Sequence, residues 1–236
     1  MAIGKGGLGP ASRAALRRAR KGSKLNRLVG DVKNLKKMVN KTIENKQQTY
    51  NAHSIDIMDF PIAQRPTLLL TQGAADGDAR PSAARIGNSV TLMRTQLNLS
   101  VKIKSGVTNC RCRLIVVESV EGNQSLDMDD ILQSGGGAID GLTDTTYTSC
   151  YTTKTDTNKR YKIHYDKVVN LSTYDRAFFM KKLVLRYGKT GRVINYDGNN
   201  STPTDYSLQV LAIGDQSLVA AAPSLSYSMR STYKDA

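Results

Sequence analysis

The 236-residue chain has no tryptophan, only three phenylalanines and only three cysteines. Its body also shows no aromatic platform of the kind that stacks nucleic-acid bases. Cys110, Cys112 and Cys150 form an odd set without disulfide-framework spacing, and no signal peptide precedes them, so we expect reduced thiols in a cytosolic or nuclear protein. No apolar run approaches the roughly 18 residues of a membrane span, so we expect a soluble protein without a membrane partner.

Catalytic and metal-binding motifs are also missing. The two histidines, His53 and His164, have no Ser or Cys nucleophile in a recognisable elbow near them. A zinc site would need both of them together with Cys110 and Cys112, which alternation places on one face of a strand. We therefore expect no catalytic residue, no cofactor and no metal, and we interpret His164 as a partly exposed strand residue.

Two short motifs resemble binding loops but have simpler interpretations. YGKTG (187–191) lacks the first glycine of a phosphate-binding loop and follows a strand, so it predicts a hairpin turn. SLDMDDIL predicts a helix start with Asp127 as N-cap, Asp130 at the third position, and Leu126 packing on Ile131. A calcium loop would also need a pivot glycine and a terminal bidentate acid, although calcium between subunits remains an alternative.

Positive charge is concentrated at the N-terminus. Of the 34 Lys and Arg residues, 13 lie in the first 46 positions, opposed only by Asp31 and Glu44, so this arm carries +11 of the net +14. Such an arm binds phosphates through counterion release without fixed geometry, and RRARK within it also fits a nuclear localisation signal. The candidate nucleic-acid-binding residues are Lys5, Arg13, Arg17, Arg18, Arg20, Lys21, Lys24, Arg27, Lys33, Lys36, Lys37 and Lys41.

Part of the arm is expected to be helical. Leu25, Leu28, Val32, Leu35 and Val39 recur at steps of three and four, which predicts an amphipathic helix with a narrow apolar stripe. This seam would pack against other subunits while most of the basic residues lie off it. The alternative is that the helix docks on its own body.

Residues 47–236 are rich in strand-forming segments separated by turns, after the arm of residues 1–46. The phase of the apolar residues changes near Met93 and Arg94, which predicts a bulge or bend, and we count the ribbon around it as two strands. Residues 72–88 have a loop composition that permits no core. About eight strands without intervening helices predict an all-β, eight-stranded antiparallel jelly-roll sandwich. The expected strand segments are Gln48–Met58, Thr67–Thr71, Ser89–Lys104, Arg113–Glu118, Tyr161–Leu171, Met180–Tyr187, Tyr206–Ile213 and Leu225–Tyr233.

The order of these segments resembles a known family. A basic arm and a helix precede LTQGAADGDARPSAARIGNSVTLMRTQLNLSV (70–101), followed by RLIVVE, YKIHYDKVVNLS (161–172) and FFMKKLVLRY (178–187). This pattern resembles the single-jelly-roll capsid proteins of small circular Rep-encoding single-stranded DNA viruses, which are similar to the coat protein of satellite tobacco necrosis virus. The resemblance covers most of residues 25–236, with an arm less Arg-rich than in circoviruses.

The resemblance implies a viral capsid protein. About 60 copies would form an icosahedral T=1 shell around a single-stranded viral genome, with the helical seam meeting two symmetry copies at a threefold axis. The expected locations are the virion and, during assembly, the host nucleus; the receptor and the genome type, DNA or RNA, stay open. Body cations expected on the inner face, whichever sheet forms it, are Lys102, Lys104, Lys181, Lys182 and Arg186.

A non-viral nucleic-acid-binding protein with a basic tail is the alternative. A ribosomal or chromatin component would carry such a tail. Against it, the body shows no recognition-module motif and holds only +3 of the net charge.

Overall fold

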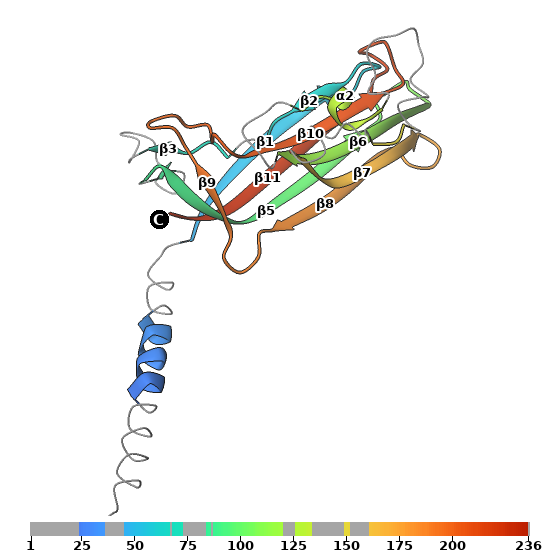
Figure 1. Cartoon of the computed structure of the whole chain (residues 1–236). Coiled ribbons are helices and arrows are strands. Elements are labelled where there is room, and N and C mark those ends of the chain that lie inside the picture. The colour runs from blue at the N-terminus through green and yellow to red at the C-terminus, as the bar shows by residue number, and fades with distance from the viewer. Residues whose placement is uncertain are drawn as a thin grey trace, which may run out of the picture. The chain divides into compact units, whose positions relative to one another are not determined.

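The computed structural model of the chain describes residues 24–35, 45–66, 68–72, 84–85, 87–119, 126–133, 149–151 and 161–235. The chain divides into two units, Met1–Glu44 and Asn45–Ala236, which are described separately. In the first unit, residues 24–35 form a helix, drawn in blue in Figure 1, which confirms the predicted helix over that range. Val39, at the end of the predicted seam, lies outside the described residues.

Five strands form the first sheet, which we call sheet A. Its order is β1-β11-β5-β8, and β9 also pairs with β5. All of these pairings are antiparallel. The bounds are β1 Asn45–Asp56, β5 Ser89–Lys102, β8 Phe178–Arg186, β9 Arg192–Asn195 and β11 Ser224–Asp235.

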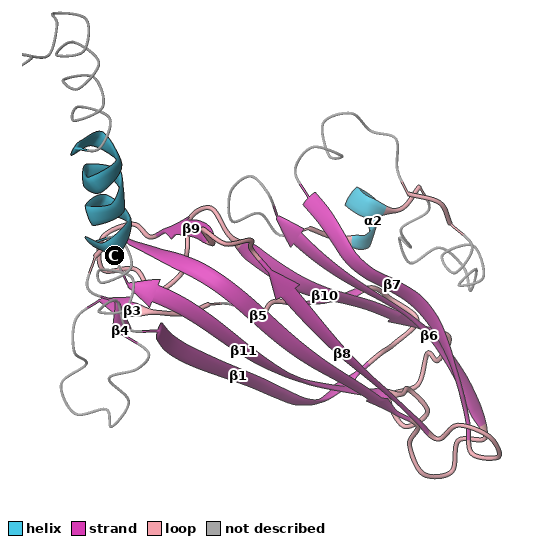
Figure 2. Ribbon diagram, turned by 90° about the horizontal axis from the view of Figure 1, so that it is seen from below, coloured by secondary structure: helices cyan, strands magenta, loops and turns pink. Residues whose placement is uncertain are grey.

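Four antiparallel strands form the second sheet, sheet B, in the order β2-β10-β6-β7. The bounds are β2 Ile62–Gln64, β6 Asn109–Ser119, β7 Tyr161–Ser172 and β10 Ser207–Gly214. A short parallel pair, β3 Thr71–Gln72 and β4 Ala84–Arg85, stands apart from both sheets. Figure 2 shows β1, β11, β5 and β8 side by side in one layer, with sheet B as the other layer.

The chain crosses between the two sheets at almost every step. It passes from β1 in sheet A to β2 in sheet B, returns to β5, crosses to β6 and β7, returns to β8, and then visits β10 and β11 (Figure 1). Two interleaved four-stranded sheets with this order are a jelly roll. The predicted all-β, eight-stranded jelly-roll sandwich is confirmed, with β9 as an additional short strand.

The core lies between the inner faces of the two sheets. Leu97, Leu99 and Val101 of β5 belong to the same buried cluster as Cys112 and Leu114 of β6. Because β6 and β10 also bury their other face, they read as continuous apolar runs rather than as alternating strands. The strands are therefore held by apolar burial on one side in sheet A and on both sides in the centre of sheet B.

A short helix, α2 (Met128–Ile131), covers the second face of sheet B. Leu126 and Ile131 are buried with Ile115 and Leu211 of that sheet. Asp127 is the N-cap, and its backbone N–H donates to the Asp130 carboxylate at 2.9 Å. The predicted helix start is therefore confirmed. The helix packs here because its apolar residues cover the outer side of sheet B.

The predicted bulge in β5 lies at Met93. Arg94 pairs with Thr232 of β11 and Leu92 with Tyr233, so Met93 is one extra residue on β5. Leu92 before the bulge and Leu97 after it are thereby both buried. Our count of two strands here is wrong, because β5 is one continuous strand of 14 residues.

The turn at 187–191 is not a hairpin. β8 and β9 pair with successive parts of the same edge of β5 and run in the same direction, so the turn links two collinear segments. Gly191 has a φ of 77°, and a Cβ there would lie 2.5 Å from the Thr91 side chain and 2.8 Å from that of Met93. The glycine is required both by its backbone conformation and by its close approach to the bulge.

Arg85 corrects the expectation that residues 72–88 contribute nothing to the core. Its side chain is fully buried, lies 4.5 Å from the centre of the Tyr196 ring, and donates to the carbonyl oxygens of Leu70, Gly87, Gly198 and Asn200. Only an arginine presents five donors in one plane, so one side chain satisfies carbonyls from three loops. The predicted strand at 67–71 is also wrong in extent, since β3 starts at Thr71.

Glu118 of β6 links the two sheets. Its carboxylate accepts a hydrogen bond from Arg192 of β9 and forms another with His164 Nε2 of β7 at 2.6 Å. His164 is a strand residue of intermediate exposure, as expected, with its side chain 12 % exposed, but the sequence did not indicate its contact with Glu118. Burial would raise the pKa of Glu118, but the His164 hydrogen bond and the charge of Arg192 outweigh it and lower that pKa below its ordinary value.

We expect Glu118→Gln to lower the free energy of unfolding by about 1–3 kcal/mol at pH 7, because partly buried Arg192 loses its charged partner. A lowered pKa means that the carboxylate stabilises the fold above the pKa of the unfolded chain, and that this contribution is lost as the pH falls through the folded-state pKa. Urea unfolding over a pH series should show the two proteins converging below about pH 4. Asp197→Asn, at an exposed carboxylate, is the control; an acid transition kept in full by Glu118→Gln would contradict this assignment.

Candidate nucleic-acid interface

The structure describes only part of the predicted arm site. Lys24, Arg27 and Lys33 lie on the helix of residues 24–35 and are exposed. Of the seam, Leu25, Leu28, Val32 and Leu35 lie on the same helix, with side chains 58–65 % exposed. The predicted binding residues outside the described part of the chain are Lys5, Arg13, Arg17, Arg18, Arg20, Lys21, Lys36, Lys37 and Lys41.

Sheet A presents a polar outer face, formed by the side chains that alternate with its core residues. Small polar and amide residues such as Thr49, Ser228 and Asn98 occupy most of it. Strand register aligns Thr49, Arg230 and Gln96 in one row, and Ser228, Asn98 and Lys182 in the next. The cations at outward positions of this face are Arg94, Lys102, Lys182, Arg186, Arg230 and Lys234.

The cations of the outer face have little acidic compensation. Within β1, β5, β8 and β11, the acid at an outward position is Asp56, and Lys104 already pairs with it at 2.6 Å. Arg94 and Arg186 lie directly opposite each other on neighbouring strands. Like charges in such a cross-strand pair are destabilising, so a bound anion would reduce the electrostatic repulsion between the two arginines.

The body cations expected from sequence divide into two groups. Lys102, Lys182 and Arg186 lie on the outer face as described above. Lys104 lies beyond the end of β5 and is already paired, because it forms an ion pair with Asp56 and donates to the Val219 carbonyl. Lys181 points to the other side of β8, with its Nζ 5.4 Å from the centre of the Tyr165 ring.

Sequence reasoning missed Arg94 and Arg230. Arg94 directly follows the bulge, so the face to which its side chain points depends on which residue of β5 has no partner on β11. Arg230 lies between Met229 and Ser231, which are both buried. Because serines occur on both faces of this strand, the buried face could not be recognised from the sequence. The strict alternation of Leu97, Leu99 and Val101, extended back to Arg94, would have revealed the first of these.

The three cysteines are free, and Cys150 is exposed whereas the other two are buried. Cys110 and Cys112 share the inward face of β6, as predicted, and both are buried. Burial raises the pKa of the Cys110 thiol to about 11 and that of Cys112 further, so both are protonated near neutral pH. Among the described residues, no group of His, Cys, Asp and Glu could hold a metal ion, and no helix is long and apolar enough to cross a membrane.

Comparisons with known proteins show similarity at the level of solved structures. No protein-family model matches the chain, and no curated protein matches it. A chain of Desmodium yellow mottle tymovirus is 7 % identical with a TM-score of 0.39, covering 82 % of this chain and 88 % of that one. A chain of Broad Bean Stain Virus is 12 % identical with a TM-score of 0.33, covering 80 % of this chain and 84 % of that one. Values this low carry no argument, so the fold assignment rests on the strand order.

If the outer face contacts phosphates, the double variant Arg94→Gln/Lys182→Gln should bind a 20-nucleotide oligothymidylate with a weaker salt dependence. Each lost contact lowers the slope of log K against log salt by about 0.7 for single strands. Fluorescence anisotropy across a salt series measures the slope. Lys46→Gln/Lys104→Gln removes the same charge from lysines paired with Asp235 and Asp56. Equal slopes in the two double variants would leave the outer face without a role.

Proposed function

We propose that the chain is a viral coat protein that assembles into a closed icosahedral shell and packages a single-stranded genome through its basic N-terminal arm. The observation that carries the proposal is the jelly-roll strand order of a body whose first strand, β1, is directly preceded by residues 1–44, which hold 12 basic and 2 acidic side chains and so carry +10. The body would form the wall, and the arm would neutralise phosphates inside it. About 60 copies would complete the smallest such shell.

Sheet A supports this division of roles. The arm joins the body at Asn45, the first residue of β1, and β1 is the edge strand of the sheet that bears the cationic outer face. The outer side of sheet B is instead apolar where it packs against α2. Sheet A is therefore the better candidate for the inner wall, where it would meet the same polyanion as the arm.

The resemblance in sequence pattern supports a narrower proposal. It points to the capsid proteins of small circular Rep-encoding single-stranded DNA viruses, with the virion as final location and the host nucleus as the site of assembly. RRARK in the arm fits entry into the nucleus. The nucleic acid recovered from particles, tested with DNase and RNase, decides between DNA and RNA.

Purified protein mixed with single-stranded nucleic acid should form uniform closed particles. Electron microscopy and gel filtration at several salt concentrations and pH values test this. A protein that remains monomeric or forms small oligomers throughout, yet binds nucleic acid, would instead support a non-viral nucleic-acid-binding protein with a basic tail.

Deletion of residues 1–24 is the matched variant for this experiment. It removes seven basic residues and no acid. Packaged nucleic acid per particle should fall, and the salt dependence of binding should flatten, because fewer counterions are released. Unchanged packaging would place the genome contacts on the body alone.

The apolar seam should act between subunits. Leu28→Ser/Val32→Ser/Leu35→Ser keeps the charge of the helix but removes apolar side chains worth about 1.5–3 kcal/mol each when buried. We expect a lower melting temperature or a lower yield of particles, with the unfolding of the isolated subunit unchanged. Differential scanning calorimetry of particles and urea unfolding of subunits measure the two effects.

Asn26→Ser/Asn34→Ser, at exposed positions off the stripe, controls for helix propensity. Loss of stability in the isolated subunit, seen with the seam variant alone, would show that the helix docks on its own body. The threefold arrangement would then be wrong.

A further inference from the structure

A groove lies where the edge strands of the two sheets, β7 and β8, approach each other. It encloses about 520 Å³, within the range of small-molecule sites. Three cations from three places line it: Lys167 of β7, Lys181 of β8, and Arg176 of the connection between these strands. None of the lining residues is acidic, so the groove has an uncompensated positive charge.

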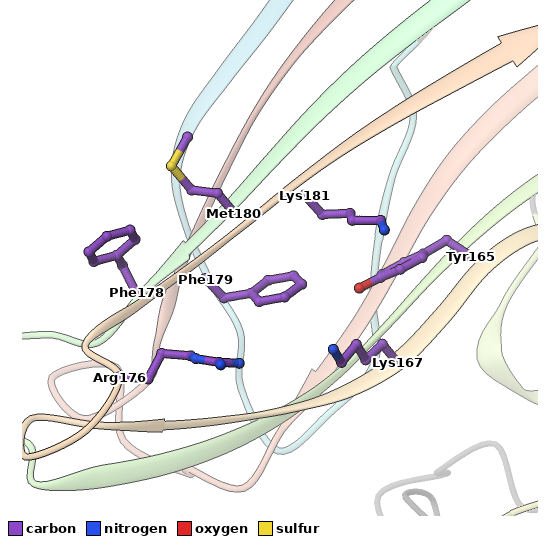
Figure 3. Close-up of a pocket in the computed structure, with 7 residues that line it drawn as sticks. All are labelled: Tyr165, Lys167, Arg176, Phe178, Phe179, Met180 and Lys181. Carbon is purple, nitrogen blue, oxygen red and sulfur yellow. The ribbon is translucent and has the colours of Figure 1, made fainter.

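Aromatic rings lie among these cations. The Lys167 Nζ is 5.4 Å from the centre of the Phe179 ring, and the Lys181 Nζ is 5.4 Å from that of Tyr165. In Figure 3 the side chains of Arg176 and Tyr165 approach Phe179 from opposite sides. The rings hold the two ammonium groups beside the cavity, where both groups remain able to donate to a ligand oxygen.

The Tyr165 hydroxyl is buried and has no hydrogen-bond partner among the described residues. It points toward the centre of the groove in Figure 3. A buried hydroxyl without a partner costs free energy, and a ligand oxygen within reach would remove that cost. This observation is independent of the charges and indicates a missing polar ligand at the same place.

The groove continues onto the outer face of sheet A. Phe178 and Met180 also line it, and their side chains are 61 % and 68 % exposed. Phe178 lies opposite Lys102 in the register of β8 and β5. An exposed ring beside a cation is one element of a single-strand binding surface, and the small number of aromatic residues in the sequence concealed it.

We propose that this β7–β8 groove binds a backbone phosphate of single-stranded nucleic acid through Lys167, Arg176 and Lys181, with the Tyr165 hydroxyl donating to a phosphate oxygen and the neighbouring base stacked on Phe178. The proposal rests on the function proposed above, because the packaged genome supplies the ligand. Three donors of fixed position distinguish this site from the arm, whose contacts need no geometry. A strand held here would run from the groove along Lys102 and the outer face.

Photocrosslinking tests the site on the full-length protein. The probe is an oligothymidylate with one 5-iododeoxyuridine, irradiated in complex with the protein and analysed by peptide mass spectrometry. We expect a crosslink to Phe178 or Tyr165. In Lys167→Gln/Lys181→Gln the yield at these residues should fall about fivefold, because two phosphate contacts are lost.

Two further variants separate charge from stacking. Lys162→Gln/Lys189→Gln removes the same charge from exposed lysines outside the groove and should leave the yield unchanged. Phe178→Leu keeps the apolar bulk but removes the ring, and it should abolish the crosslink at position 178 while the affinity for the oligonucleotide falls less than twofold.

Three results would overturn the proposal. The first is crosslinks confined to the arm. The second is a heparin fragment that binds in the groove while the oligonucleotide crosslinks only elsewhere on the protein, which would indicate a sulfated sugar as ligand. The third is failure of the groove variant, but not of its control, to form particles without nucleic acid, which would indicate a contact between subunits. Groove crosslinks on a protein that never forms particles would support the site and overturn the coat function.

Discussion

The alternation of side chains along β5 is the constraint on which both the core and the candidate interface depend. After the bulge, odd-numbered residues such as Leu97 face the core and even-numbered residues such as Asn98 face outward; before it, Leu92 faces the core from an even position. Without the extra residue at Met93, the strand segment on one side of the bulge would turn its core side chains outward and its polar side chains inward. Arg94 would then enter the core, or Leu92 would leave it. One local irregularity therefore fixes two surfaces at once.

The sequence predicted those strands that are long enough to show either an alternating or a continuous pattern of apolar residues. β5 shows strict alternation and β6 a continuous apolar run, and both were located correctly. β2 and β9, with three and four residues, are too short to display a period, and they form because longer neighbours offer them an edge. Arg85 was missed for a different reason: its burial is decided by loop carbonyls, including those of Gly198 and Asn200, which are far away in the chain.

The candidate site was less predictable than the fold. The arm could be recognised from charge alone, because its proposed function needs no geometry. The body cations depend on strand phase, and FFMKKLVLR has apolar residues in both phases, so Lys181 and Lys182 could not be assigned to faces before the register was known. The groove is lined by residues of β7 and β8, which belong to different sheets, so the sequence of either strand alone does not predict it. Its clearest signal, the unpartnered Tyr165 hydroxyl, exists only in three dimensions.

The arm and the body hold positive charge in different ways. Beyond position 46, 21 basic residues are accompanied by 18 acids, so most body cations could find carboxylate partners. Lys104, Arg113 and Arg192 do so, with Asp56, Asp166 and Glu118. Arg94 and Arg186 are instead held opposite each other, although an uncharged residue at either position would relieve their repulsion. Solubility alone would be served equally well by cations scattered over the surface. An anion bound on the sheet would relieve the repulsion of this pair, and a genome packaged as proposed above would supply such an anion.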